Sequence, residues 1–286
     1  MEEGKKGFFE ALEPKSAVIV GVAGGFLALC AIGFFILGYF AITRGFGAGP
    51  NGQAVAQAGQ NTPADTQTAE PAQQVDAAAS ANPSDKPVVE LFVMSYCPYG
   101  LQMEKAFLPV MELLKNKAAM SIRFVSYSMH EKKEIDENTR QYCIQKEQNA
   151  KYIAYLKCFT AKGDPDACVR EAAVSQSSLS ACMTSADRQF GITAKYEDKS
   201  SWLGGQYPVY PIDVGLNAKY KVEGSPTLVI NGAQVNAGRS PEAVKQAVCA
   251  AFKTAPSECS KTLSADFTSA GFGEGTGGGT TAGCGS

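Results

Sequence analysis

One cysteine stands where an apolar run of residues gives way to a helical pattern. The run 88–96 ends at Cys97, and Pro98 follows directly. Proline suits the first position of a helix because the N–H that it lacks would have no helical partner there. Free backbone N–H groups and the helix dipole at such a terminus favour the thiolate form of cysteine. Because the thiolate is the nucleophile of disulfide exchange, the sequence predicts thiol–disulfide chemistry at Cys97.

The second half of a dithiol site is missing. A Cys-x-x-Cys couple would need cysteine at position 100, where the chain has Gly100. Three fates of a mixed disulfide at Cys97 remain open. In the first, an external, glutathione-like thiol resolves the mixed disulfide. In the second, a distant cysteine resolves it, and Cys284 is the candidate. In the third, the site is redox-inactive. Disulfide isomerisation is also allowed, because thiolate attack needs no second cysteine.

The other cysteines indicate an oxidising compartment. The chain has nine cysteines, and only Cys30 lies in the first ninety residues. So many thiols in one region are typical of structural disulfides outside the cytosol. A zinc site would need paired cysteine spacings or several histidines, and the chain has one histidine. We therefore predict no metal and no cofactor.

Spacing favours one set of disulfides. Cys158 and Cys168 lie ten residues apart across a Gly-Asp-Pro break, and Cys249 and Cys259 have the same separation across a proline. Cys143 would then pair with Cys182. A bond from Cys158 to Cys182 remains open as an alternative, because six cysteines allow fifteen pairings.

The N-terminal part of the chain predicts a membrane anchor. Residues 17–42 form an uncharged apolar run, which as a helix would span roughly 39 Å, enough to cross a bilayer. We expect an uncleaved helix rather than a signal peptide. More lysines precede the run than follow it, which places residues 1–16 in the cytoplasm and the rest outside. Residues 43–86 are polar and alanine-rich, and predict a disordered linker.

Residues 87–260 predict one globular domain. A strand at 88–94, a helix from 98 to about 117 and a strand at 120–127 form a βαβ unit. A helical insertion follows at about 131–215. A strand then leads through Asn231-Gly232, a hairpin signal, to a short strand and a last helix that begins after Ser240. Residues 261–286 predict a glycine-rich flexible tail.

This order of elements resembles the thioredoxin superfamily, and a helical insertion at that place resembles the DsbA family. The run VELFVMSYCPYG, the insertion cysteines and the ending PTLVING are also similar to the gamma-interferon-inducible lysosomal thiol reductase family. The active-site loop is similar to the Cys-Pro-Tyr-Cys of glutaredoxins, with glycine in place of the last cysteine. The expected fold class is α/β, a thioredoxin-like fold with a helical insertion, preceded by a single transmembrane helix.

The resemblance implies roles for individual residues. Cys97 would be the attacking thiol, and Pro226 would be a cis-proline that faces it. The backbone of Ser225 would then turn outward and pair with a substrate in strand fashion. Tyr96 and Tyr99 would form an apolar rim, although simple packing explains them equally well. The implied substrate-binding residues are Tyr96, Pro98, Tyr99, Gly100, Ser225 and Thr227.

These observations together predict a membrane-anchored extracytoplasmic thiol–disulfide oxidoreductase, of reductase or isomerase type, that acts through a single nucleophilic Cys97. The alternative is a redox-inactive module that binds a peptide or partner beside Pro226. Expected partners are protein thiols or disulfides and a membrane electron donor. The net charge of −2 gives no sign of nucleic-acid binding. A sulfur buried away from Pro226, or locked in a permanent crosslink, would argue against catalysis.

Overall fold

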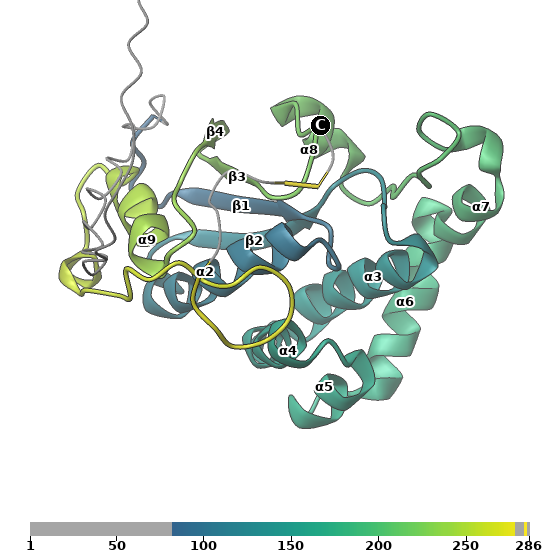
Figure 1. Ribbon diagram of the computed structural model, residues 1–286, viewed down its shortest axis with the longest axis horizontal. Helices are drawn as coiled ribbons and strands as arrows, with labels where there is room; N and C mark the ends of the chain where they lie inside the picture. The colour runs from purple at the N-terminus through teal and green to yellow at the C-terminus, as the bar shows by residue number, and fades with distance from the viewer. Residues whose placement is uncertain (1–81, 278–282, 285–286) are drawn as a thin grey trace, which may run out of the picture. The chain divides into compact units, whose positions relative to one another are not determined.

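A mixed sheet of four strands forms the centre of the computed structural model, which describes residues 82–277 and 283–284. The strand order is β2-β1-β3-β4 (Figure 1). β1 pairs with β2 in parallel and with β3 antiparallel, and β3 pairs antiparallel with β4. The strands are β1 (Val88–Val93), β2 (Ala119–Phe124), β3 (Thr227–Ile230) and β4 (Ala233–Val235). Helix α2 (Pro98–Leu114) connects β1 to β2, and α9 (Pro241–Ala250) follows β4. This βαβ–ββα arrangement is thioredoxin-like, as predicted.

Local signals explain the second half of this arrangement. Asn231 and Gly232 both have positive φ, +47° and +84°, so they form the tight turn between β3 and β4. Ser240 caps α9, because its hydroxyl accepts a hydrogen bond from the N–H of Ala243 at 3.2 Å. The hairpin and the last helix thus begin where the sequence predicts them.

The insertion between β2 and β3 is helical and extends to Tyr220, past the predicted end at residue 215. Three of the four disulfides among the described residues stabilise the insertion and the last helix. Cys143–Cys182 joins α3 to α6, Cys158–Cys168 joins α4 to α5, and Cys249–Cys259 joins α9 to a short 3-10 helix, Ser257–Ser260. The alternative pair Cys158–Cys182 does not occur. The insertion helices are α3 (Glu131–Glu147), α4 (Asn149–Lys162), α5 (Pro165–Glu171), α6 (Gln176–Phe190), α7 (Ile192–Glu197) and α8 (Val214–Tyr220), with a 3-10 turn at Lys199–Ser201.

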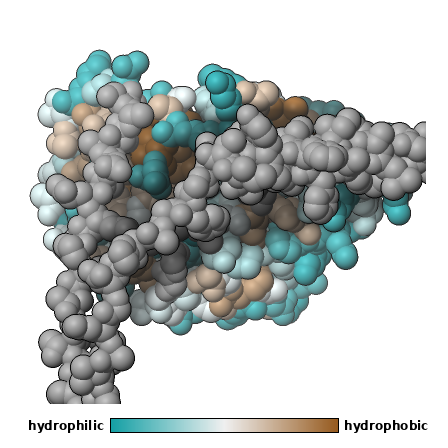
Figure 2. Space-filling model, turned by 45° about the horizontal axis from the view of Figure 1, so that its top comes forward, coloured by the Kyte–Doolittle hydropathy of each residue, from teal (hydrophilic) through white to brown (hydrophobic). Residues whose placement is uncertain are grey.

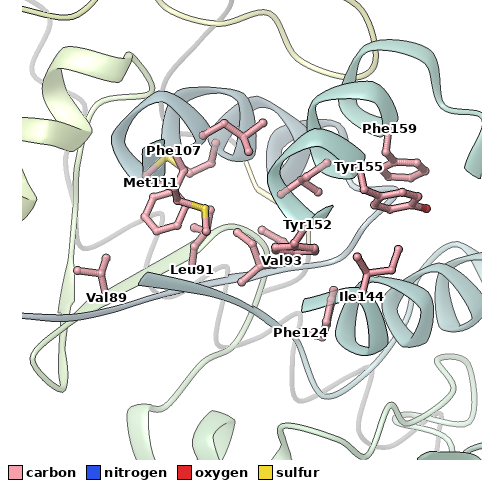
Figure 3. Close-up of a cluster of buried hydrophobic side chains, with 14 of the residues drawn as sticks. Val89, Leu91, Val93, Phe107, Met111, Phe124, Ile144, Tyr152, Tyr155 and Phe159 are labelled. Atoms are coloured by element: carbon pink, nitrogen blue, oxygen red, sulfur yellow. The ribbon is translucent and has the colours of Figure 1, made fainter. Parts of the chain in front are cut away.

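Strand β1 is buried on both faces, as expected for a strand inside a covered sheet. Its odd-numbered residues pack against side chains of α2 and α4, among them Phe107, Met111, Tyr152 and Phe159 (Figure 3). Phe92, on the opposite face, belongs to a second buried cluster that also holds Cys97. Cys97 therefore follows a strand that two hydrophobic layers hold in place.

The predicted domain limits and flexible tail need correction. Ser84 already pairs with the chain beside Phe252, so the domain begins before residue 87. Residues 261–277 do not form a free tail. They run along α2 and loop beside α4, as the yellow segment in Figure 1 shows, and make hydrogen bonds to several elements. Their glycine-rich composition predicts flexibility, but side chains and carbonyl groups of the domain supply the partners that order them.

The predicted anchor at 17–42 and linker at 43–86, apart from the last residues of the linker, lie outside the described residues. Within 82–277 and 283–284, no helix is long and apolar enough to cross a membrane. On the face drawn in Figure 2, hydrophilic residues surround smaller hydrophobic areas.

Candidate active site

Cys97 is the N-cap residue of α2. Its backbone is extended, with φ −67° and ψ 122°, while its carbonyl oxygen already accepts the N–H of Leu101 at 2.9 Å. The N–H of Gly100 points at Cys97 Sγ, 3.3 Å away. Pro98 takes the first helical position without leaving an N–H unpaired. A thiolate at this place would receive a backbone hydrogen bond and lie at the positive end of the helix dipole.

A disulfide joins Cys97 to Cys284, with 6.1 Å between their Cα atoms and a sequence separation of 187 residues. The two cysteines differ in exposure. Cys97 is 0 % exposed, whereas Cys284 is partly exposed. The structure thus brings together two residues that the sequence analysis named separately, as nucleophile and as distant second thiol.

The tail also pairs with Ser225 through the backbone. The N–H of Ser225 donates to the carbonyl oxygen of Cys284 at 2.8 Å, and the N–H of Cys284 donates to that of Ser225 at 2.7 Å. The Ser225–Pro226 peptide is cis, and Ser225 O lies 3.6 Å from Cys97 Sγ. Gly283 fits closely here, because a Cβ on it would lie 3.0 Å from Ser225 O. Cys284 therefore forms an isolated antiparallel bridge with Ser225, at the backbone groups that the sequence analysis expects a substrate to use.

The side chain of Ser225 fills the space that a second active-site cysteine would need. Its hydroxyl accepts a hydrogen bond from the N–H of Met94 at 2.9 Å. A Cβ added to Gly100 would lie 2.6 Å from Ser225 Oγ and 3.1 Å from Met94 O. The missing side chain at Gly100 therefore leaves the space that the Ser225 hydroxyl occupies.

Substituting Gly100→Cys is expected to destabilise the protein instead of restoring a dithiol site. Overpacking of this kind costs about 1–3 kcal/mol of unfolding free energy. The double variant Gly100→Cys/Ser225→Ala should recover part of that loss, because it removes the nearer obstacle. Urea denaturation of both variants, with Ser225→Ala as the control, measures this. Equal stability of Gly100→Cys and the natural chain would contradict the expectation.

Helix α3 holds the loop before Cys97. The N–H of Ser95 donates to Asn138 Oδ1 at 3.1 Å, and the N–H of Tyr96 donates to Glu134 Oε1 at 3.1 Å. Burial disfavours the charged form of Glu134, but hydrogen bonds from His130 and Ser128 outweigh it and hold the pKa of Glu134 below its ordinary value. An ionised, fully buried Glu134 therefore fixes the backbone one residue before Cys97.

The remaining predicted site residues contact the tail or the walls of the site. Tyr96 packs edge-on against Phe272 at 5.8 Å between ring centroids. Pro98 is exposed, and its carbonyl oxygen accepts the N–H of Gly271 at 2.8 Å. The guanidinium carbon of Arg239 lies 5.6 Å from the Tyr99 ring centroid. The hydroxyl of Thr227 donates to the carbonyl oxygen of Gly224 at 2.8 Å and so supports the loop before Pro226.

Sequence reasoning missed the residues that hold the tail on α2. Lys105 Nζ donates to Ser269 Oγ and to the carbonyl oxygens of Gly271 and Gly273, at 3.0, 2.9 and 2.9 Å. Phe272 packs edge-on against Phe159 as well as Tyr96, at 5.3 Å between ring centroids from Phe159. A phenylalanine within a glycine-rich segment was the available signal for this contact. Residues 82–277 and 283–284 contain no cluster of three or more residues suited to a metal.

Two buried carboxyl groups lie behind the active-site loop. Glu104 on α2 is 0 % exposed, and neither of its carboxyl oxygens has a hydrogen-bond partner among the described residues. Burial, with a smaller effect from Glu137, raises the pKa of Glu104 well above its ordinary value. Burial also raises the pKa of Glu137 to about 7, although Arg140 and hydrogen bonds from Gln141 and Tyr155 oppose it. Both groups resist ionisation.

Loss of the Glu137 proton should lower the free energy of unfolding as pH rises from about 4.5 to about 7. The pKa of Glu137 is 4.5 for an ordinary glutamate and about 7 in the fold, so the folded state binds more protons in this window and loses stability as they leave. The full shift corresponds to about 3 kcal/mol of unfolding free energy. Urea denaturation at pH 5 and pH 8 tests this. Glu137→Gln should reduce the slope without removing it, because burial also raises the pKa of Glu104, and an unchanged slope in that variant would contradict the assignment.

Comparison with known proteins adds a likeness to solved structures. No family model and no curated protein matches the sequence. Reduced DsbA from Mycobacterium tuberculosis is similar at 16 % identity and a TM-score of 0.42, over 64 % of this chain and 95 % of that one. DsbG from the same organism is similar at 15 % identity and a TM-score of 0.41, over 63 % and 90 %. MdbA from Actinomyces oris, a thiol-disulfide oxidoreductase, is similar at 17 % and 0.38, over 60 % and 84 %. With scores this low, function has to be argued from the site itself.

Proposed function

We propose that the protein is a thiol–disulfide oxidoreductase that acts through Cys97, in a domain tethered to the outer side of a membrane. The observation that carries the proposal is the position of Cys97 Sγ. It lies at the N-terminus of α2, under the Gly100 N–H, beside Ser225 and the cis-proline Pro226. This combination supplies a stabilised thiolate and an adjacent backbone edge for an extended substrate.

The chemistry follows from these groups. The Cys97 thiolate attacks one sulfur of a protein disulfide, a Cys97–substrate bond forms, and the other substrate sulfur leaves as a thiolate. Ser225 offers one N–H and one carbonyl group to the substrate backbone. Cys284 uses both of these groups in the oxidised form, so the tail and a substrate strand exclude each other. Cys284 or an external thiol then displaces the substrate from Cys97.

A redox-inactive binding module is the second candidate, and one observation favours it. Cys97 is fully buried and already crosslinked to Cys284. A permanent crosslink would leave the site without a reactive thiol. The difference between the candidates is therefore whether this bond opens and whether the freed thiol is reactive.

Alkylation of the reduced full-length protein tests the proposal. After mild reduction, the alkylation rate of Cys97 should already be on its plateau at pH 7, and a peptide disulfide should give a trappable Cys97 adduct. An unfolded peptide with residues 94–100 serves as the control, because an ordinary cysteine, with a pKa of about 8.5, still gains reactivity above pH 7. A rate that rises like that of the peptide, without an adduct, would favour the binding module.

The membrane anchor and the extracytoplasmic location are part of the same proposal. They are supported by the apolar run at 17–42, the lysines before it and the cysteine content. Protein thiols or disulfides would be the substrates, with a membrane electron donor as a further partner. Membrane fractionation with protease protection of the C-terminal domain tests the arrangement.

A further inference from the structure

We propose that an external thiol opens the oxidised protein by attacking Cys284, so that the tail cysteine, and not Cys97, forms the first mixed disulfide with the incoming thiol. This inference rests on the proposed function and adds to it the direction in which the bond opens. Two independent features carry it, namely the exposure of the two cysteines and the stabilisation of the leaving thiolate, and the anchoring of the tail adds a consequence.

The two cysteines differ in exposure. A thiolate attacks a disulfide sulfur and displaces the partner sulfur, so the nucleophile must reach the sulfur that it attacks. Cys97 is 0 % exposed and belongs to a buried cluster with Phe92, Met94, Val125 and Val229. Cys284 is partly exposed and only packs against that cluster. An incoming thiol can therefore approach Cys284 but not Cys97.

The leaving group favours the same direction. Attack at Cys284 releases Cys97 as the thiolate, which stays at the N-terminus of α2 with the Gly100 N–H 3.3 Å from its sulfur. A stabilised thiolate leaves faster. Attack at Cys97 would instead release Cys284, whose described contacts include no such helix terminus. Both accessibility and leaving-group stability thus select the tail cysteine.

The electrons and atoms balance in two steps. The partner thiolate forms a bond to Cys284 Sγ, the Cys97–Cys284 bond breaks, and its electron pair leaves with Cys97 Sγ. A second partner thiol then displaces Cys284 as a thiolate and leaves as the oxidised partner disulfide. Two partner thiols are oxidised, and one protein disulfide is reduced.

The contacts that anchor the tail determine what happens after the Cys97–Cys284 bond breaks. Lys105 and the packing of Phe272 hold the tail upstream of Cys284. Among the described residues, the hydrogen bonds between the tail and Ser225 are, by contrast, the two made by residue 284 itself. Loss of the disulfide can therefore free Ser225 for a substrate while Lys105 keeps the tail close by. One attack at Cys284 would both generate the Cys97 thiolate and clear its binding edge.

A pulse of reduced glutathione on the oxidised full-length protein tests the inference. Samples are quenched in acid, which stops exchange by protonating thiolates, and are digested with pepsin at the same low pH. Mass spectrometry then assigns the glutathione adduct. We expect the adduct on Cys284 at least about tenfold more often than on Cys97 when the data are extrapolated to zero time, where a tenfold preference corresponds to about 1.4 kcal/mol.

The same digest contains a matched control. Cys249 and Cys259 form a disulfide in which both residues are partly exposed. Adducts there at the rate seen for Cys284 would show indiscriminate attack and would overturn the inference. Adducts on Cys97 at least as frequent as on Cys284 would also overturn it, while leaving the proposed function intact. A Cys97–Cys284 bond that stays closed throughout would contradict both proposals.

Discussion

Replacing Cys284 by serine is expected to leave Cys97 trapped as a long-lived mixed disulfide after exposure to oxidised glutathione. In the natural chain the tethered thiol displaces glutathione and closes the Cys97–Cys284 bond, which is the bond that the structure contains. A thiol held on a short tether acts at a millimolar effective concentration. Against a micromolar free thiol, the adduct lifetime should increase roughly a thousandfold.

Intact-mass measurement over time checks this expectation. The natural chain should show oxidation without retained glutathione, and Cys284→Ser should retain one glutathione on Cys97. The double variant Cys249→Ser/Cys259→Ser is the control, because it removes a disulfide that lies elsewhere and should behave as the natural chain does. Rapid loss of glutathione from Cys284→Ser would show that Cys284 is not the second thiol.

Removing the Cys143–Cys182 disulfide should cause a larger loss of stability than removing either of the short-loop disulfides. Its cysteines are 39 residues apart, against 10 for Cys158–Cys168 and for Cys249–Cys259. The chain-entropy relation then gives about 4 kcal/mol for Cys143–Cys182 and about 2.7 kcal/mol for each of the others. Since the free energy of unfolding of a domain is only about 5–15 kcal/mol, removal of the Cys143–Cys182 disulfide brings the protein close to complete unfolding.

Urea denaturation of Cys143→Ala/Cys182→Ala and Cys158→Ala/Cys168→Ala, without reductant, compares the two losses. Alanine is suitable because all four cysteines are buried, so no polar group enters the core. A smaller loss for the longer loop would mean that contacts between α3 and α6, rather than loop closure, set the stability of the insertion.

The parts of the fold that could be predicted depend on neighbours in the sequence. Pro98 after Cys97, Asn231 before Gly232 and Ser240 before Pro241 each determine the local backbone through residues one to three positions away. Such signals place the strand–helix junction, the hairpin and the last helix without knowledge of the rest of the chain. The same holds for the two disulfides whose cysteines are ten residues apart.

The order in the tail could not be predicted, because it depends on residues far away in the sequence. Residues 269–273 are ordered by Lys105, and Gly283 approaches Ser225 closely. Composition alone describes a segment that cannot form its own core, and it says nothing about hydrogen bonds and ring contacts that another part of the chain provides. The match between Gly100 and Ser225 is of the same kind, since 125 positions separate them.

The hydrogen bonds from the loop before Cys97 to α3 affect how this domain can be engineered. Asn138 and Glu134 accept the N–H groups of Ser95 and Tyr96, two consecutive residues before Cys97. A version of this domain without the inserted helices would lose both acceptors and leave the two N–H groups of the loop before Cys97 unpaired. The insertion is therefore part of the structure that positions Cys97. A shortened version would need replacement acceptors for these two N–H groups to keep Cys97 in place.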